Sequence, residues 1–483
     1  MTNAKFTDYP LNDELLKAIH ILNFESPTKV QQHVIPAVFE RKDIIVKSRT
    51  GSGKTAAFAI PVCQLTDWNE NKPQALVITP TRELALQVKE ELFNIGRFKR
   101  LKVSAVFGKA PFNIQERELK QKTHIVVGTP GRIIDHIERG TLDTSGIKYL
   151  VIDEADEMLS MGFIGQTETI IRNLPKKRVT MLFSATMPTD IRDLCGKYMK
   201  KPVLVEVEEQ NAAADRISEQ RYTVGPKEKM ELLLDIMMVE NPDSCIVFCN
   251  TKQKVDEVAK GLSNLKYACK KIHGGMEQSD RQKVMDDFKK GTFRYLVATD
   301  IAARGIDIEK ITLIVNYDLP LDGEGYVHRI GRTGRAQNTG RAISFATQYE
   351  NNFLSAIEQY TGKEIPLKER PDKETVQNSK KEFLRKMDTS PEVKKTKGAR
   401  LSKEIVRLHI NAGKKTKMRP VDIVGTLCNI RGMTAGDIGI IQIADVSTYV
   451  EVLNNKGELV FRELQTTPIK GRLRKVSKVD MQV

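Results

Sequence analysis

The sequence of 483 residues contains no apolar run long enough to cross a bilayer, which would need about 18 residues. The first residues are polar and lead into no apolar signal segment. We therefore expect a cytoplasmic protein with no membrane partner.

Cysteine is scarce and is not arranged for metal binding. The six cysteines form no Cys-x-x-Cys pair and no Cys/His array, so no zinc site is expected. Most of them lie in apolar stretches, where a reduced thiol acts as a small core residue. They are Cys63, Cys195, Cys245, Cys249, Cys269 and Cys428.

Negative charge is in short supply in the last fifth of the chain. The whole chain has a net charge of +15, and residues 380–483 hold 22 Lys and Arg against 11 Asp and Glu. A localised basic block is typical of a protein that binds a polyanion, most simply nucleic acid. Charge alone leaves open a basic tail that only aids solubility.

The length predicts two to four domains, at roughly 100–200 residues each. Residues 1–207 alternate short apolar runs with amphipathic stretches, which predicts a parallel α/β sheet covered on both faces. Residues 208–368 repeat that alternation, and residues 369–400 have the composition of a charged linker, with a helix expected near Lys380–Met387. The order βαββαβ in residues 401–483 predicts a small ferredoxin-like α+β domain.

The expected strands are short apolar runs bounded by turn residues. In the first domain they are 43–48, 75–80, 103–108, 124–129, 149–153 and 179–186. In the second domain they are 245–250, 295–299, 313–317 and 342–346. The last domain has strand candidates 405–410, 438–443, 449–453 and 473–476, with helices at 420–430 and 458–465.

A Gly-rich turn follows the first expected strand and opens a helix. It reads Ser48-Arg49-Thr50-Gly51-Ser52-Gly53-Lys54-Thr55. Glycines let backbone N–H groups approach phosphate oxygens, and a helix N-terminus favours an anion. In such a loop Lys54 can reach the β- and γ-phosphates, and Thr55 can ligate Mg²⁺. Ser48 stands where the pattern usually has a glycine, so the prediction depends on the strand–turn–helix context.

Carboxylates follow another expected strand, in the run Asp153-Glu154-Ala155-Asp156. One carboxylate can hold Mg²⁺ while the next orients a water molecule for phosphate hydrolysis. Alone, the run could equally be a solvated turn. The phosphate loop favours the catalytic interpretation, because the carboxyl ends of parallel strands meet at one edge of the sheet. We therefore expect Asp153 to hold Mg²⁺ and Glu154 to act as the base.

Further short motifs lie in a fixed order along the two α/β domains. The first domain holds Pro80-Thr81-Arg82-Glu83-Leu84-Ala85, Thr129-Pro130-Gly131-Arg132 and Ser184-Ala185-Thr186. The second holds Ala298-Thr299-Asp300, Ala303-Arg304-Gly305-Ile306-Asp307 and His328-Arg329-Ile330-Gly331-Arg332-Thr333-Gly334-Arg335. In order and spacing, these motifs resemble the DEAD-box RNA helicases over nearly all of residues 6–350. The resemblance implies two tandem RecA-like domains and an RNA-stimulated ATPase that uses ATP and Mg²⁺.

The resemblance also implies an adenine-reading segment, Pro27-Thr28-Lys29-Val30-Gln31. Gln31 would hydrogen-bond to the adenine edge and Phe24 would pack on its face, while Phe6 matches the upstream aromatic of the family. Asn23 stands where the family prefers glycine. Without the resemblance, Gln31 would be taken for an ordinary residue on a helix surface.

Two arginines of the second domain match the arginine fingers of the family. Arg332 and Arg335 would stabilise transition-state charge, an effect on the order of 10³–10⁵ in rate in related systems. A basic surface loop would explain their charge but not the regular glycines around them. Gly305 and Asp307 match the motif whose aspartate contacts the ribose. The residues implied to couple the nucleotide site to domain closure are Asp156, Ser184 and Thr186.

The resemblance places an RNA track along both domains, with sequence-tolerant contacts to phosphates. Its residues are Arg82, Gly108, Thr129, Arg132, Thr251, Gly274, Arg281 and Thr299. Lys109 replaces the second glycine of a family Gly-Gly motif and could add a phosphate contact. Only the first domain has the phosphate loop and only the second has the fingers, so hydrolysis is expected to require both domains closed around ATP and RNA.

The last ~80 residues resemble the RRM-like RNA-binding domain of the DbpA/YxiN subfamily, notably at Val421–Gly425 and Asp437–Ile441. That resemblance implies a target hairpin in 23S ribosomal RNA and a role in assembly of the large ribosomal subunit. Most of the stacking aromatics of an RRM are missing, and Tyr449 stands where two are usual. The basic residues expected to grip folded RNA are Lys414, Lys415, Lys417, Arg419, Arg472, Arg474 and Lys475.

Two other functions remain compatible with the sequence. One is a general RNA helicase of cold adaptation or mRNA decay, and the other is a nucleotide-gated RNA clamp or chaperone. A DNA translocase is disfavoured, since the motifs at 80–85 and 129–132 match the RNA family. The expected partners are a 23S hairpin and the large-subunit precursor, bound by a monomer.

Overall fold

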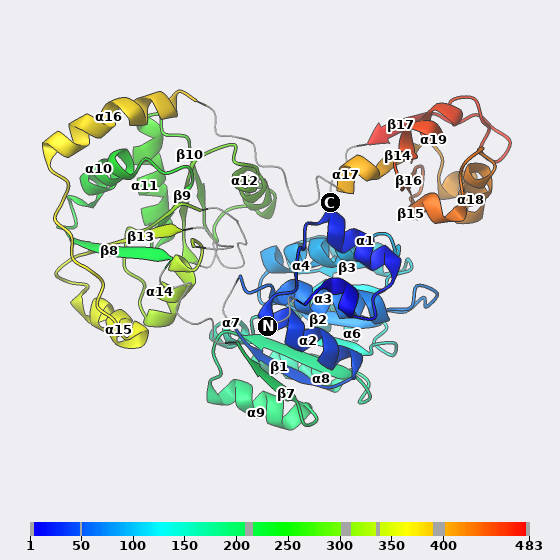
Figure 1. Cartoon of the computed structure of the whole chain (residues 1–483), viewed down its shortest axis with the longest axis horizontal. Coiled ribbons are helices and arrows are strands. Elements are labelled where there is room, and N and C mark those ends of the chain that lie inside the picture. Colours follow the sequence, from blue (N-terminus) through cyan, green and yellow to red (C-terminus); the bar gives the residue numbers. More distant parts are fainter. Residues whose placement is uncertain are drawn as a thin grey trace. The chain divides into compact units, whose positions relative to one another are not determined.

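The computed structural model describes residues 4–48, 51–207, 216–300, 311–334, 339–389 and 401–479 (Figure 1). The chain divides into two compact units, Met1–Val207 with Lys397–Val483, and Glu208–Thr396. Among the helices of the described ranges, none is both long and apolar enough to span a membrane.

The first domain is built on seven parallel strands in the order β3-β4-β2-β5-β6-β1-β7. The strands are β1 (Ile44–Lys47), β2 (Ala75–Ile78), β3 (Val103–Val106), β4 (Ile125–Gly128), β5 (Tyr149–Ile152), β6 (Val179–Ser184) and β7 (Val203–Glu206). The helices are η1 (Phe6–Asp8), α1 (Asp13–Ile21), α2 (Lys29–Phe39), α3 (Lys54–Leu65), α4 (Arg82–Ile95), α5 (Phe112–Leu119), α6 (Pro130–Glu138), α7 (Ala155–Ser160), α8 (Ile164–Arg172) and α9 (Thr189–Tyr198).

The strands of this sheet are apolar throughout because both faces are covered. Successive residues of one strand enter two different cores, as Leu76 and Val77 of β2 show. This is the pattern of a parallel sheet between two helical layers. The six strands expected in this domain are all present, and β7 at the sheet edge is an addition.

The second domain repeats the plan with six strands in the order β10-β11-β9-β12-β13-β8. Its strands are β8 (Ile217–Thr223), β9 (Cys245–Phe248), β10 (Cys269–Ile272), β11 (Tyr295–Ala298), β12 (Leu313–Asn316) and β13 (Gly340–Ala346). Its helices are α10 (Lys229–Glu240), α11 (Lys252–Asn264), α12 (Gln278–Lys290), α14 (Gly323–Ile330), α15 (Asn351–Thr361) and α16 (Lys373–Met387). The four expected strands are central, and the two that were not expected, β8 and β10, are the two edges.

Helix α16 lies inside the linker-like stretch; it confirms the helix expected near Lys380–Met387 and begins earlier, at Lys373. Its Phe383 is only 2% exposed and packs against Tyr267, with ring centroids 5.4 Å apart. The Arg294 guanidinium donates to the carbonyl oxygens of Lys386 and Thr389, at 3.2 and 3.0 Å, and so satisfies the end of the helix. The described part of this stretch is therefore packed on the second domain.

The C-terminal domain has an antiparallel four-stranded sheet in the order β15-β16-β14-β17. Its elements are α17 (Leu401–Glu404), β14 (Val406–Ile410), η3 (Lys414–Thr416), α18 (Pro420–Cys428), η4 (Ala435–Asp437), β15 (Ile438–Ile443), β16 (Thr448–Val452), α19 (Gly457–Glu463) and β17 (Val476–Val479). The order βαββαβ is confirmed. The last strand begins at residue 476, where residues 473–476 were expected.

Candidate active site

Three neighbouring strands of the first sheet, β5, β6 and β1, end at the same edge. The phosphate loop follows β1, the Asp153–Asp156 run follows β5, and Ser184 ends β6. The Ser48 N–H donates to the Ser184 carbonyl at 3.0 Å. The fold thus brings together motifs that lie about a hundred residues apart in the sequence.

The phosphate loop has the backbone that its glycines predict. Gly51 and Gly53 have φ values of 90° and 82°, in the left-handed region that favours glycine. A Cβ on Gly53 would also come within 2.7 Å of the Gln31 Nε2 atom. The ammonium group of Lys54, buried at 8% exposure, donates to the Ser48 carbonyl at 3.0 Å. Arg49 and Thr50 lie outside the described residues.

The segment expected to read adenine is fastened to this loop. Gln31 Nε2 donates to the Gly53 carbonyl at 3.2 Å, and Thr28 Oγ1 donates to the Ser52 carbonyl at 3.0 Å. Phe6 and Phe24, both upstream of this segment, contact each other with ring centroids 6.4 Å apart. These contacts give Gln31 a structural role in positioning the loop, and its contact with adenine stays a prediction.

Asp153 is a buried carboxylate at the end of β5, 3% exposed. Burial raises the pKa of Asp153 to about 7, while the Lys54 ammonium opposes this shift and the Glu154 carboxylate adds to it. A divalent cation would favour its charged form. Thr55, in the first turn of α3, is a hydroxyl-bearing residue that follows β1 at the same edge. Carboxylate and hydroxyl oxygens are hard donors that suit Mg²⁺, so this set fits the ion.

Glu154 has a backbone conformation that is rare for a residue with a side chain. Its φ and ψ are 51° and 56°, and it stands at the start of α7. The Glu154 N–H donates to the Asp153 carboxylate at 3.0 Å, which ties the two residues together. A conformation of this kind costs of order 1–3 kcal/mol and is common at functional sites. It agrees with the role of base expected for Glu154.

Asp156 is hydrogen-bonded to the Ser184–Thr186 motif. One oxygen of its carboxylate accepts the N–H groups of Ala185 and Thr186, both at 2.9 Å. The Ser184 hydroxyl accepts the Asp156 N–H at 3.2 Å and donates to the Thr186 carbonyl at 2.6 Å. The three residues expected to couple the site to domain closure therefore form one network.

The predicted RNA residues of the first domain follow β2, β3 and β4, at the same edge as the nucleotide motifs. Gly108 lies next to Arg82, since a Cβ on Gly108 would be 4.0 Å from the Arg82 Nη2 atom. Thr129 caps α6, and Arg132 in its first turn donates to the Ala110 carbonyl at 3.0 Å. The structure brings these residues to one edge, and it also gives Arg132 an internal partner.

In the second domain, three predicted RNA residues follow successive strands. Thr251, Gly274 and Thr299 come after β9, β10 and β11, at the carboxyl edge of that sheet. Thr251 is the N-cap of α11 and accepts the Lys254 N–H at 3.1 Å. Arg281 lies in the first turn of α12, which follows β10.

A buried residue at this edge that the sequence did not single out is Arg329 on α14. Its guanidinium is buried at 2% exposure and donates to the Asp300 carboxylate at 2.5 and 2.7 Å. The same group donates to the Asn250 side chain at 2.8 Å, so it joins the ends of β9 and β11. Arg332, one turn on and 6% exposed, donates to the His328 carbonyl at 3.2 Å. Gly305, Asp307 and Arg335 lie outside the described residues.

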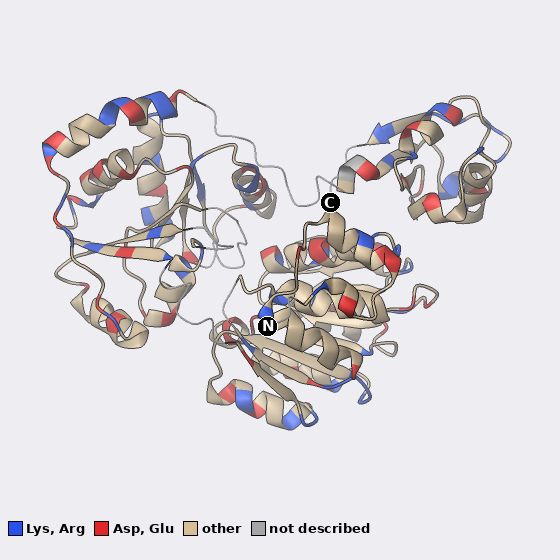
Figure 2. Ribbon diagram, in the orientation of Figure 1, with Lys and Arg blue, Asp and Glu red and all other residues tan. Residues whose placement is uncertain are grey.

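The basic residues of the C-terminal domain gather on two loops that touch. Lys470 donates to the Lys417 carbonyl at 2.5 Å and to the Asp422 carboxylate at 3.2 Å. Figure 2 shows Lys and Arg along these loops and β17. Six of the seven predicted residues are exposed and Arg474 is half-buried; the exposed ones are Lys414, Lys415, Lys417, Arg419, Arg472 and Lys475.

Comparison with known families divides the chain as the structure does. Residues 28–194 match the DEAD/DEAH box helicase family, and residues 228–337 match the helicase conserved C-terminal domain. Residues 407–478 match the DbpA RNA binding domain. These matches cover all three folded domains.

Relatives and solved structures agree with the family matches. The chain is 56% identical to the ATP-dependent RNA helicase DbpA of Bacillus subtilis over 477 residues, 99% of this chain and 100% of that protein. It is 43% identical to the DEAD-box helicase CshA of the same organism, over 76% of this chain and 74% of the relative. The structure of S. cerevisiae Dbp5 bound to RNA and ADP BeF3 aligns with a TM-score of 0.71 and 31% identity, covering 79% of this chain and 99% of that one. The chain therefore belongs to the DbpA subfamily of the DEAD-box ATP-dependent RNA helicases.

Proposed function

We propose how this RNA-stimulated ATPase divides the work of hydrolysis among its residues. Glu154 orients and deprotonates the attacking water, and Lys54 with the loop N–H groups holds the phosphates. Asp153 and Thr55 hold Mg²⁺, which supplies positive charge to the phosphates when it is bound. Arg332 and Arg335 of the second domain act on the same reaction. The phosphate loop and Asp153 lie at the same edge of the first sheet, and this arrangement supports the roles proposed for Lys54, Asp153 and Glu154.

We propose in addition that the C-terminal domain directs the helicase to a hairpin of 23S ribosomal RNA during large-subunit assembly. The observation that carries this proposal is the 56% identity to a DbpA helicase along the whole chain, the C-terminal domain included. The paired basic loops support it, because exposed lysines and arginines can grip the phosphates of a folded RNA. We propose that the protein acts in the cytoplasm and as a monomer.

The test is the RNA-stimulated ATPase of the full chain with a 23S hairpin fragment and with an unrelated structured RNA. The variant Lys414→Glu/Lys415→Glu reverses two exposed charges on the C-terminal loop. It should raise the concentration of the 23S fragment needed for half-maximal stimulation by roughly tenfold or more, since each lost phosphate contact weakens binding. The preference for 23S RNA should fall with it.

The matched control is Lys380→Glu/Lys381→Glu, because these two lysines are also adjacent and exposed, but lie on α16. The control should keep the 23S preference. Equal stimulation of the unchanged chain by both RNAs would refute the 23S target and favour a general RNA helicase. A chain that hydrolyses ATP and holds RNA but separates no duplex would favour the clamp.

A further inference from the structure

The sheet of the C-terminal domain has one face on its own core and one outer face. Leu408, Val450 and Val452 point into the core beneath α18 and α19. Arg407 and Tyr449 alternate with these residues and so lie on the outer face. In RRM-like folds this outer face is the one that stacks bases.

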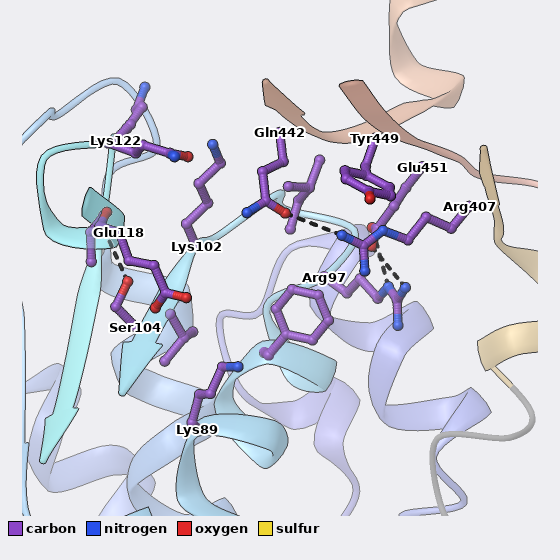
Figure 3. Close-up of a pocket in the computed structure, with 15 residues that line it drawn as sticks. Lys89, Arg97, Lys102, Ser104, Glu118, Lys122, Arg407, Gln442, Tyr449 and Glu451 are labelled. Carbon is purple, nitrogen blue, oxygen red and sulfur yellow. Dashed lines mark hydrogen bonds and ion pairs between the residues drawn. The ribbon is translucent and has the colours of Figure 1, made fainter. Parts of the chain in front are cut away.

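The outer face is partly covered by the first helicase domain, which belongs to the same compact unit. Glu451 of β16 is only 4% exposed, although it lies on the same face as Tyr449. Its carboxylate accepts two hydrogen bonds from Arg97, at 2.9 and 3.3 Å (Figure 3). Arg97 lies just after α4 and is 2% exposed, with its guanidinium 4.9 Å from the centre of the Phe93 ring.

Three further contacts surround this pair. Arg100 donates to the Ala435 carbonyl at 2.6 Å, and Lys102 donates to the Ile441 carbonyl at 3.2 Å. Lys17 of α1 donates to the Asn454 side chain at 2.7 Å. The apolar cluster of the first domain extends into the C-terminal domain through Leu401, Ile405 and Leu453, each at most 1% exposed.

The character of the central pair indicates a specific interface. A two-pronged Arg–carboxylate pair requires a defined geometry, and neither charge could remain buried without the other. Arg97 and Glu451 are 354 positions apart in the chain, so the pair fixes a tertiary arrangement. Beside it lies a cavity of about 250 Å³, lined by Lys102 and Glu118 on one side and Arg407 and Tyr449 on the other (Figure 3).

We propose that the outer sheet face of the RNA-binding domain is a docking surface for the first helicase domain, fastened by the Arg97–Glu451 pair. While docked, the domain binds RNA with its basic loops and not by stacking bases on Tyr449. The helicase motor and the RNA-targeting loops are then held in a fixed relation. This inference goes beyond the proposed function, because it does not depend on which RNA the loops select.

Energy transfer between dyes at the exposed residues Glu70 and Arg431 measures docking in the full chain. The variants are Arg97→Glu, Glu451→Arg and both together. Each single variant places two like charges at the interface, and we expect the ratio of docked to undocked molecules to fall on the order of a hundredfold. The double variant restores an ion pair and should recover the transfer. A circular dichroism melt checks that each variant is folded.

Unchanged transfer in the single variants would overturn the docking role of the pair, and so would a double variant that stays undocked.

RNA binding tests the second half of the proposal, which is that bases do not stack on the sheet face. Tyr449→Ala should change the RNA dissociation constant by less than roughly twofold, whereas loss of a stacking platform costs between roughly fivefold and a hundredfold. A loss in that range would show that RNA uses the sheet face, contrary to the proposal.

Discussion

The two helicase domains place different chemistry at the same edge of the same kind of sheet. In the first, the edge carries a phosphate loop and the carboxylates of Asp153 and Asp156. In the second, it carries the buried guanidinium groups of Arg329 and Arg332. Both domains put these groups after parallel strands, where loops of the α/β fold converge. The fold therefore fixes the place of a site, while a few residues decide its chemistry.

The largest expected effect comes from the second domain. Arg332→Ala should lower the rate of RNA-stimulated ATP hydrolysis by on the order of 10³–10⁵, because it removes charge that stabilises the transition state. ATP binding, which depends on the loop of the first domain, should persist. Steady-state ATPase assays measure the rate of hydrolysis, and nucleotide titration measures ATP binding. Arg341, exposed on β13 of the same sheet, provides the control Arg341→Ala. Wild-type turnover in the Arg332 variant would remove the second domain from the chemistry.

The corresponding change in the first domain is Glu154→Gln. Loss of a general base should slow hydrolysis by roughly 10²–10⁴, with ATP and RNA binding retained. The glutamine keeps the size of the side chain, so a fall in binding would contradict a purely catalytic role. The exposed Glu138 on α6 offers the matched control Glu138→Gln.

A smaller effect, on strand separation, is expected from the network of Asp156, Ser184 and Thr186 beside the nucleotide site. Ser184→Ala removes the hydroxyl that links the Asp156 N–H to the Thr186 carbonyl. The loss of buried hydrogen bonds of this kind costs about 1–3 kcal/mol, so strand separation should fall roughly tenfold. ATP hydrolysis should fall less. An equal loss of both activities would show that Ser184 serves the chemistry itself. Ser160→Ala, on the exposed side of α7, is the control.

The prediction with the smallest expected effect at neutral pH concerns acid stability of the first domain. His124 is fully buried, accepts the Lys102 N–H at Nδ1 (2.9 Å) and donates from Nε2 to the Trp68 carbonyl (3.0 Å). Burial lowers the pKa of His124 to about 4 from its usual 6.5. Protonation therefore favours the unfolded chain. The contribution of neutral His124 to the free energy of unfolding is fully present above pH 6.5. It declines by up to about 3 kcal/mol as the pH falls towards 4.

The variant His124→Asn can still accept from the Lys102 N–H but does not titrate, so its free energy of unfolding should depend less on pH in this range. The single tryptophan of the chain, Trp68, reports this domain alone by fluorescence. If the free energy of unfolding of His124→Asn depended on pH as that of the wild type does, His124 would not be the source of the acid sensitivity. His20→Asn, at an exposed position on α1, should leave the profile as it is.

The central strands of both sheets could be predicted from the sequence because they are buried on two faces and are apolar throughout, as β2 and β9 are. The strands that were missed, β7, β8 and β10, are edge strands with exposed or polar positions. An edge strand needs only part of its surface buried, so the apolar signal weakens there. Of helix α16, only the part near Lys380–Met387 was predicted, since Phe383 is its one buried residue and the turns that begin at Lys373 carry no apolar signal.

The nucleotide motifs could be predicted because each is short and its chemistry is local. The phosphate loop and the Asp153–Asp156 run lie where the strand order brings them, at the ends of β1 and β5. The role of Arg329 and the Arg97–Glu451 pair could not be inferred in this way, because each joins residues that are distant in the sequence. Their partners become visible only when the chain is folded.

The measurement that tests the division of labour most directly is a double-mutant cycle on single-turnover ATP hydrolysis at saturating RNA. It compares Glu154→Gln, Arg332→Ala and the double variant. If the two domains act on one chemical step, the losses should not add, and the double variant should hydrolyse ATP about as slowly as the slower single variant. Losses that multiply in full, or wild-type turnover in either single variant, would show that Glu154 and Arg332 do not act on one chemical step.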